Sequence, residues 1–131
     1  MMKRGELAKR TECNIETVRY YEKAGLLADP PRTAKGYRIY DESHEKTLRF
    51  ILQSRKLGFT VEEVRDLLTL VSGGNYTCDE ILEKTQAHLK SVQARITDLQ
   101  RLESTLLKTI AKCKGGNTPD CAIVEALGEK N

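Results

Sequence analysis

The feature that most constrains this chain is the segment from Cys78 to Cys113, which contains neither proline nor glycine. Seam positions recur three and four residues apart along it, with one irregular step, and they are Leu82, Thr85, Leu89, Val92, Ile96, Leu99, Leu102, Leu106 and Ile110. This heptad-like spacing predicts a single long helix with one largely apolar seam. Because a lone exposed helix is unstable in water, we expect the seam to pack against a second copy of the chain. Packing against the preceding part of the same chain is the simpler alternative.

Shorter helices are predicted before that segment. A first helix begins with Leu7 and Ala8, Asn14 is a suitable N-cap for a second, and Gly25 is placed to end it. Two short helices joined by a tight turn form the helix-turn-helix pattern, in which the second helix enters the major groove of DNA. The pattern alone is weakly specific, since other helical hairpins share it.

The stretch "ADPPRTAKGYRIYDES" interrupts the helical period. Two prolines exclude a helix, Gly36 permits a tight turn, and "YRIY" alternates as a strand does. These signals predict a small hairpin, or wing. It carries cations and tyrosines suited to DNA phosphate contact, namely Arg32, Lys35, Tyr37, Arg38 and Tyr40.

Two more helices are expected after the wing. Asp41 or Ser43 can cap the first, and Thr60 with Glu63 forms a capping box for the second. The inner face predicted for the first helix consists of Leu48, Ile51, Leu52 and Leu57. The glycine-rich "SGGNYT" that follows is expected to be a hinge.

Charge is distributed unevenly along the chain. Residues 1–60 hold 13 Lys and Arg against 8 Asp and Glu, whereas residues 61–131 hold 9 against 11. A basic first half is typical of a domain that meets an anionic polymer, although a solvated surface alone can also explain it. We find no apolar segment long enough for a membrane span and no secretion signal, so we expect a cytoplasmic protein with reduced thiols and no membrane partner.

Three cysteines bracket the long helix. Cys78 lies at its start, Cys113 at its end, and Cys121 follows after the loop "KGGNTPD". A helix over residues 78–113 is about 52 Å long, so Cys78 and Cys113 of one chain cannot share a ligand. They are separated by five heptads and therefore lie on the same seam. In an antiparallel pair, Cys78 of one subunit meets Cys113 of the other, and the loop can return Cys121 to the same point.

This arrangement predicts a soft metal ion as the ligand. Three thiolates without a histidine in the loop favour a thiophilic cation. Structural zinc normally takes four ligands, and neither Cys13, His44 nor His88 is placed to supply the fourth. A short helix over "AIVEAL" would direct its N-terminal amides at the thiolates. Cys13, in the turn of the helix pair, is interpreted as core filler.

The combined fold class is mainly α, a winged helix-turn-helix domain followed by a long antiparallel coiled-coil helix and a metal-binding loop. The expected divisions are a DNA-binding domain at 1–72, a hinge at 73–77, a dimerisation helix at 78–112, and the loop with a terminal helix at 113–131. No catalytic triad or paired carboxylates stand out, so an enzyme is not expected.

The stretches "GELAKRTECNIETVRYYEKAGLL" and "PRTAKGYRIY" closely resemble the MerR-type transcriptional regulators. The resemblance implies a homodimer on promoter DNA that represses without metal. Metal binding then distorts the DNA so that RNA polymerase can start, which is activation through DNA shape. It further implies groove contacts by Thr17, Arg19 and Tyr20, wing contacts by Tyr37 and Arg38, phosphate contacts by Arg55 and Lys56, and metal ligation by Cys78, Cys113 and Cys121.

The resemblance also bears on the metal. The cysteine at position 78 argues for a divalent ion over copper(I), and the loop lacks the doubled cysteine and histidine of zinc-responsive members. Gly36-Tyr37-Arg38 matches the mercury members, although their loop spans nine positions between its cysteines and this one spans eight. The expected effector is therefore Hg(II).

Several alternatives stay open. Pb(II), Cd(II) or Zn(II) could be the effector within the same fold. A thiol redox switch using Cys113 and Cys121 would respond to peroxide without metal. A helical dimer with structural zinc would unfold when the metal is removed.

Overall fold

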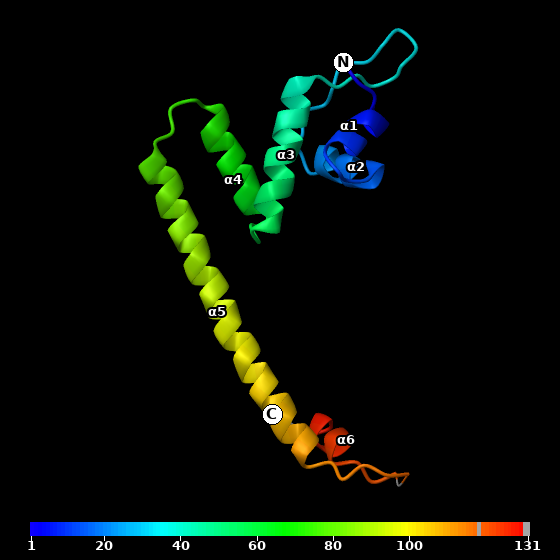
Figure 1. Cartoon of the computed structure of the whole chain (residues 1–131), viewed down its shortest axis with the longest axis vertical. Helices are drawn as coiled ribbons and strands as arrows, with labels where there is room; N and C mark the ends of the chain where they lie inside the picture. Colours follow the sequence, from blue (N-terminus) through cyan, green and yellow to red (C-terminus); the bar gives the residue numbers. More distant parts are fainter. Residues whose placement is uncertain (118, 130–131) are drawn as a thin grey trace. The chain divides into compact units, whose positions relative to one another are not determined.

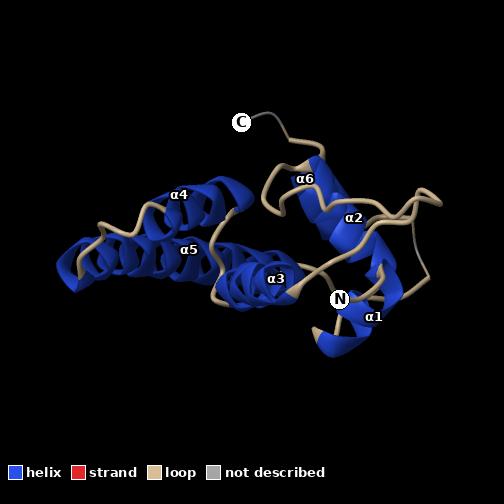
Figure 2. Cartoon of the chain, turned by 90° about the horizontal axis from the view of Figure 1, so that it is seen from above, coloured by secondary structure: helices blue, strands red, loops and turns tan. Residues whose placement is uncertain are grey.

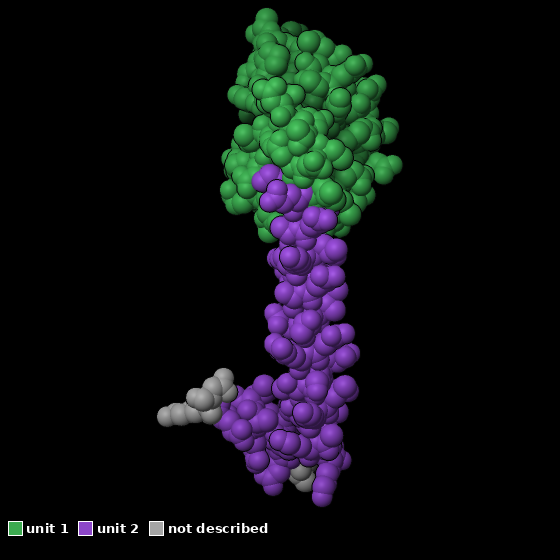
Figure 3. All heavy atoms as spheres, turned by 90° about the vertical axis from the view of Figure 1, so that its left-hand side faces the viewer, with its two compact units in different colours: residues 1–82 green, residues 83–131 purple. Residues whose placement is uncertain are grey.

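The computed structural model describes residues 1–117 and 119–129, and the regular elements among them are all helices (Figures 1 and 2). In chain order these are α1 (Arg4–Arg10), α2 (Ile15–Lys23), α3 (Glu42–Lys56), α4 (Val61–Ser72), α5 (Cys78–Ala111) and α6 (Ala122–Leu127). The mainly α fold class is confirmed. The chain forms two compact units, residues 1–82 and residues 83–131 (Figure 3). The finer division predicted from the sequence stays a prediction.

The helix-turn-helix pair consists of α1 and α2, which pack on each other. Asn14 caps α2, because its side-chain oxygen accepts a hydrogen bond from the Thr17 amide at 2.8 Å. Gly25 follows the C-cap with a φ of 78°, a left-handed conformation that favours glycine. The first helix begins at Arg4, three residues earlier than Leu7.

The wing is a short hairpin between α2 and α3. Arg32 and Arg38 form an antiparallel bridge, and the Thr33 amide donates to the Tyr37 carbonyl at 2.7 Å. Gly36 has a φ of 86° in the turn between them. At the base, Met2 and Tyr40 exchange backbone hydrogen bonds of 2.8 and 2.7 Å. The hairpin thus forms as predicted, but among the described residues its pairing is limited to isolated bridges, without the strand that the alternation suggested.

Helices α3 and α4 both start with a capping box. Asp41 caps α3 with His44 as its partner, and Thr60 caps α4 with Glu63. Leu48 and Ile51 of α3 are fully buried, as expected. Leu57, predicted on the same inner face, is 69% exposed because the helix has already ended and residue 57 is its C-cap.

The hydrophobic core lies within residues 1–82 and draws on every helix from α1 to α4 and on the wing. Its buried members are Met2, Leu7, Ala8, Val18, Tyr21, Leu26, Leu27, Tyr40, Leu48, Ile51, Phe59, Val64 and Leu67. Cys13 is partly buried against this core, and its sulfur lies 3.4 Å from the Thr11 hydroxyl.

Helix α5 forms most of the second unit. Its seam leucines and isoleucines are between 49% and 62% exposed in the single chain. His88 is the buried residue of this helix, and the described part of α6 has none. No helix in the described part of the chain has both the length and the apolar character that crossing a membrane requires.

Candidate nucleic-acid interface and thiol site

The predicted groove-facing residues lie on α2. The Thr17 hydroxyl is within 3.0 Å of the Asn14 side-chain oxygen, so it supports the cap. Arg19 is exposed and pairs with Glu16 at 2.9 Å. Tyr20 is also exposed, and its ring meets the Tyr21 ring edge-on. Arg19 and Tyr20 are therefore available to a partner from solvent.

The wing presents further cations and an aromatic ring. The Arg32 guanidinium donates to the Gly36 carbonyl at 3.2 Å, which fixes it across the hairpin turn. Lys35 is exposed at the tip, and Tyr37 is exposed with the Lys3 ammonium 4.8 Å from its ring centre. This combination of charge and hydroxyl groups suits the phosphate backbone of a nucleic acid.

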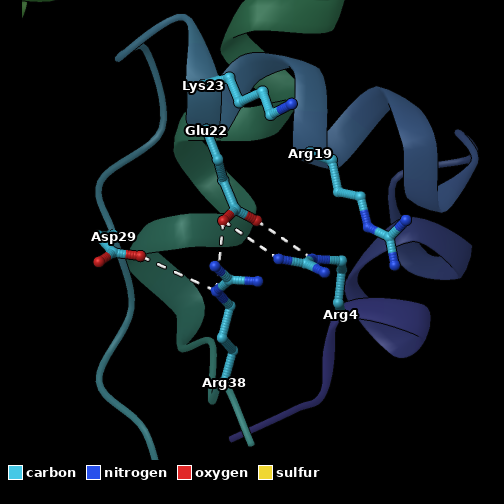
Figure 4. A pocket seen from close by; sticks show the side chains of 6 residues that line it. All are labelled: Arg4, Arg19, Glu22, Lys23, Asp29 and Arg38. Carbon is cyan, nitrogen blue, oxygen red and sulfur yellow. Dashed lines mark hydrogen bonds and ion pairs between the residues drawn. The ribbon is translucent and has the colours of Figure 1, made fainter.

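Arg38 is partly buried, unlike Arg32, Lys35 and Tyr37, which are exposed. It lines a cavity of about 280 Å³ together with Arg4, Arg19, Glu22, Lys23 and Asp29 (Figure 4). Four of these six side chains are cationic, so the cavity carries net positive charge despite its two carboxylates. Sequence reasoning assigned roles to Arg19 and Arg38 but missed Arg4, Glu22 and Lys23.

The remaining predicted phosphate contacts, Arg55 and Lys56, lie at the end of α3. Arg55 donates to the Phe59 carbonyl at 2.9 Å, which holds its side chain over the α3–α4 turn. Both residues line a second cavity of about 400 Å³, which also receives Arg49. The Arg49 side chain donates to the Arg10 carbonyl at 2.8 Å, at the end of α1. Arg38 and Arg19 thus line one of these two cavities, and Arg55 and Lys56 line the other.

The structure brings together two of the three predicted thiols. Cys113 follows the end of α5, Cys121 is the N-cap residue of α6, and the two thiols lie near enough for Cys113 to lower the pKa of Cys121. Cys78 is exposed at the first position of α5. Within residues 1–117 and 119–129 of one chain, no three His, Cys, Asp or Glu side chains gather as a metal site.

The Cys121 thiol is prepared for ionisation. The backbone amides of Val124 and Ile123 and the Cys113 thiol together hold the pKa of Cys121 below its ordinary value. The Cys121 side chain does not cap α6 by a hydrogen bond. The lowered pKa therefore reflects the backbone N–H dipoles near the thiol at the start of that helix. A pair of close thiols, one with a lowered pKa, can bind a thiophilic ion or be oxidised to a disulfide.

Comparison with known proteins identifies the relatives of this chain. The profile described as "MerR HTH family regulatory protein" matches residues 2–70, and the one described as "MerR, DNA binding" matches residues 45–109. The mercuric resistance operon regulatory protein of Bacillus cereus is 37% identical over 127 residues, covering 96% of each chain. The transcriptional regulator ZntR of Escherichia coli K12 is 38% identical over 130 residues, covering 97% of this chain and 92% of its own.

A solved structure gives the same result. The regulator PbrR691 from Ralstonia metallidurans CH34, in complex with lead(II), has a TM-score of 0.83 and 35% identity, with 98% of this chain and 100% of that chain covered. These relatives are transcriptional regulators and not enzymes. Their printed names refer to mercury in one case and to lead in another.

Proposed function

This chain belongs to the MerR family of helix-turn-helix regulatory proteins, and from that premise we propose that it is a metal-responsive transcriptional regulator. It acts in the cytoplasm as a homodimer on promoter DNA. Without metal it represses, and with a thiophilic divalent ion bound it distorts the DNA so that RNA polymerase can begin transcription. The most suitable ion is Hg(II), and Pb(II), Cd(II) and Zn(II) are the alternatives.

The DNA-binding part of the proposal rests on the exposed face of α2 and the wing. Arg19 and Tyr20 would contact the major groove, while Arg32, Lys35 and Tyr37 would contact phosphates beside it. Thr17 would join them from the first turn of α2. Arg38, Arg55 and Lys56 border the two surface cavities and would add phosphate contacts.

The dimer part rests on the exposed seam of α5. Helix α5 has 34 residues, and the leucines and isoleucines of its seam are about half exposed in the single chain. Such a helix needs a partner that buries this seam to be stable. An antiparallel pairing is favoured because it would bring Cys78 of each subunit beside Cys113 of the other. A parallel pairing would keep Cys78 of both subunits at the opposite end of the coil from Cys113 and Cys121.

The single observation that carries the metal part is the contact between the Cys113 and Cys121 thiols, with the pKa of Cys121 lowered. Metal ligation requires the thiolate, and a thiol held near amide dipoles ionises more readily. The donor set therefore fits a soft ion. Cys113 and Cys121 of one subunit would hold it, with Cys78 of the partner supplying the third sulfur.

An ultraviolet titration tests this proposal. The reduced protein is titrated with Hg(II), Pb(II), Cd(II) and Zn(II) in turn, against a competing small thiol. Hg(II) is expected to give thiolate-to-metal absorption that survives the competitor and is lost in Cys78→Ser. The matched control is Cys13→Ser, since Cys13 lies against the core beside Thr11. If Cys78→Ser binds Hg(II) normally, Cys78 is not a ligand. If another ion is retained more strongly than Hg(II) against the competitor, that ion is the effector.

A thiol redox switch is the second candidate, because the same two thiols lie close together, with Cys113 among the groups that lower the pKa of Cys121. Removing two hydrogens from Cys113 and Cys121 would form a disulfide, with peroxide as the oxidant that is reduced to water. This switch would respond to peroxide without metal and would be unaffected by Cys78→Ser. A peroxide response that requires Cys78 would argue against it.

A further inference from the structure

Glu22 is an acidic residue in an otherwise basic environment. It lies in the last turns of α2, and its side chain is only 10% exposed. A carboxylate that loses most of its water needs charged or hydrogen-bonding partners to remain ionised. The groups that surround the Glu22 carboxylate therefore indicate its role.

The partners of Glu22 come from two other elements of the first unit. Arg4 of α1 approaches both carboxylate oxygens, with its Nε 3.3 Å from Oε1 and its Nη2 3.4 Å from Oε2. Arg38 of the wing lies with its Nε 3.7 Å from Oε2. Figure 4 shows the Arg4 and Arg38 guanidinium groups converging on the Glu22 carboxylate from different sides. One carboxylate thus joins α1, α2 and the wing.

Tyr40 completes this network from the base of the wing. Its hydroxyl donates to the Glu22 carboxylate and accepts a hydrogen bond from Arg4 Nε at 3.1 Å. Burial and the neighbouring Glu22 raise the pKa of Tyr40, so the hydroxyl keeps the proton that it donates. Burial alone would lower the pKa of Arg4, but hydrogen bonds to Tyr40 and Glu22 raise it overall, so the guanidinium stays charged. The Tyr40 hydroxyl and Arg4 thus hydrogen-bond within the network. The buried Nε of Arg38, in contrast, makes no hydrogen bond among the described residues and is held by ion pairs to Glu22 at 3.7 Å and to Asp29 at 3.9 Å.

One of the groups held by Glu22 borders the surface proposed to meet DNA. Arg38 is a predicted wing contact, and Arg19 of α2 lines the same cavity. On Coulomb grounds alone, an acidic side chain there weakens DNA binding, because it repels phosphates. Its presence is explained if it fixes the orientation of the cations around it.

We infer that Glu22 is a positioning residue for DNA binding, whose carboxylate holds the wing and α1 against α2 so that Arg38 reaches the phosphate backbone while Arg19 of α2 reaches the adjacent groove. This inference rests on the proposed DNA-binding function. It extends that function to residues outside the predicted contact set, since Glu22, Arg4 and Tyr40 act through Arg38 without touching DNA themselves.

The test compares Glu22→Gln with Glu16→Gln. Both changes remove one negative charge from α2, but Glu16 has 78% of its side chain exposed and pairs with Arg19 across one helical turn. The probe is a DNA duplex selected from a random-sequence pool by the wild-type protein, and affinity is measured by fluorescence anisotropy over a range of salt concentrations. If the wild-type protein selects no duplex, the proposed function fails, and this inference fails with it.

Simple electrostatics and the positioning role predict opposite signs for Glu22→Gln. If Glu22 has the positioning role, Glu22→Gln loses one ordered phosphate contact. DNA binding should then weaken about tenfold near 0.1 M salt, and the slope of log K against log salt should decrease in magnitude by about one. Glu16→Gln should bind as tightly as the wild type or more tightly. If both variants bind equally well or better than the wild type, Glu22 has no positioning role.

A second variant separates positioning from simple loss of folding. Tyr40→Phe removes the hydroxyl without changing any charge, and urea denaturation measures the folded fraction of each variant. The expected result is weaker DNA binding with a reduced salt slope by protein that remains folded. Weaker binding explained entirely by the unfolded fraction, with an unchanged salt slope, would overturn the inference.

Discussion

Residues 1–82 and residues 83–129 obtain their stability in different ways. The first unit encloses all thirteen buried hydrophobic residues of the core, contributed by four helices and the wing. In the second unit, His88 is the buried residue of α5, and the seam leucines and isoleucines remain half exposed. The first unit thus has a core of its own, whereas the second leaves its apolar seam exposed in the single chain.

This difference has consequences for function. In the proposed function, the first unit would present Arg19, Tyr20 and the wing to DNA. A second unit completed by a partner would allow the proposed metal ligands to come from two chains.

The largest effect is expected from charges in the seam. Ile96→Asp combined with Leu99→Asp places unpaired carboxylates where the proposed dimer buries apolar side chains. Since each unpaired buried charge costs several kcal/mol, the dimer dissociation constant should rise at least about a thousandfold, roughly 4 kcal/mol. Sedimentation velocity measures the change from dimer to monomer, and far-UV circular dichroism should report loss of α5.

The control for this change is Ala87→Asp with Ala94→Asp. Both alanines are exposed, and the heptad spacing puts them on the side of α5 away from the seam. This control should remain dimeric. A seam variant that stayed dimeric would show that α5 does not form the dimer.

A core cavity tests the self-sufficiency of the first unit. Leu48→Ala removes a fully buried side chain from α3. It should lower the free energy of unfolding by about 3 kcal/mol, within the usual range for such cavities. Urea denaturation monitored by circular dichroism measures this loss, and the dimer dissociation constant should stay unchanged. Weakened dimerisation would mean that the two regions are not independent.

A helix cap gives a smaller effect in the same unit. The Thr60 hydroxyl accepts a hydrogen bond from the Glu63 amide at 3.1 Å, and the Glu63 carboxylate accepts one from the Thr60 amide at 2.9 Å. Thr60→Ala should therefore cost about 1 kcal/mol of unfolding free energy. Thr60→Ser keeps the hydroxyl and serves as the control. Equal losses in both variants would exclude the cap as the cause.

The smallest effect depends on pH. Hydrogen bonds from Ser43 and His44 lower the pKa of Asp41 to about 2. In the unfolded chain an aspartate has a pKa of about 3.9, so the ionised carboxylate stabilises the fold above about pH 4. This contribution is lost as the pH falls through about 2. Asp41→Asn keeps a capping side chain without the charge.

The stability difference between wild type and Asp41→Asn should accordingly shrink between about pH 5 and pH 2. Urea titrations at several pH values measure it. A difference that stays constant over this range would show that the ionised carboxylate adds nothing to the cap.

Local signals predicted most of the helices correctly. Asn14, Asp41 and Thr60 each cap a helix as expected, and α5 begins at Cys78 and ends two residues before Cys113. These features depend on neighbours within a few residues, so the sequence alone reveals them. The prediction that Leu57 lies on the inner face of α3 was wrong, because the helical spacing of an apolar residue does not indicate where the helix ends.

The site was only partly predictable for a related reason. Glu22 and Arg4 are 18 positions apart, and Glu22 and Tyr40 are also 18 apart. No periodicity links such positions, and only the folded packing of α1, α2 and the wing brings them together. The approach of Cys113 to Cys121, in contrast, follows from a short loop between them.

In the proposed site, two chains are needed to bind one metal ion, and a mixed dimer tests this requirement. Chains carrying Cys78→Ser are refolded with chains carrying Cys113→Ser and Cys121→Ser, and bound Hg(II) is counted in the isolated heterodimer against a competing thiol. Neither mutant homodimer should hold the ion, whereas the heterodimer should hold one ion, because one set of three thiols remains intact across its two chains. A heterodimer without Hg(II), or a Cys78→Ser homodimer that binds it normally, would contradict the shared site.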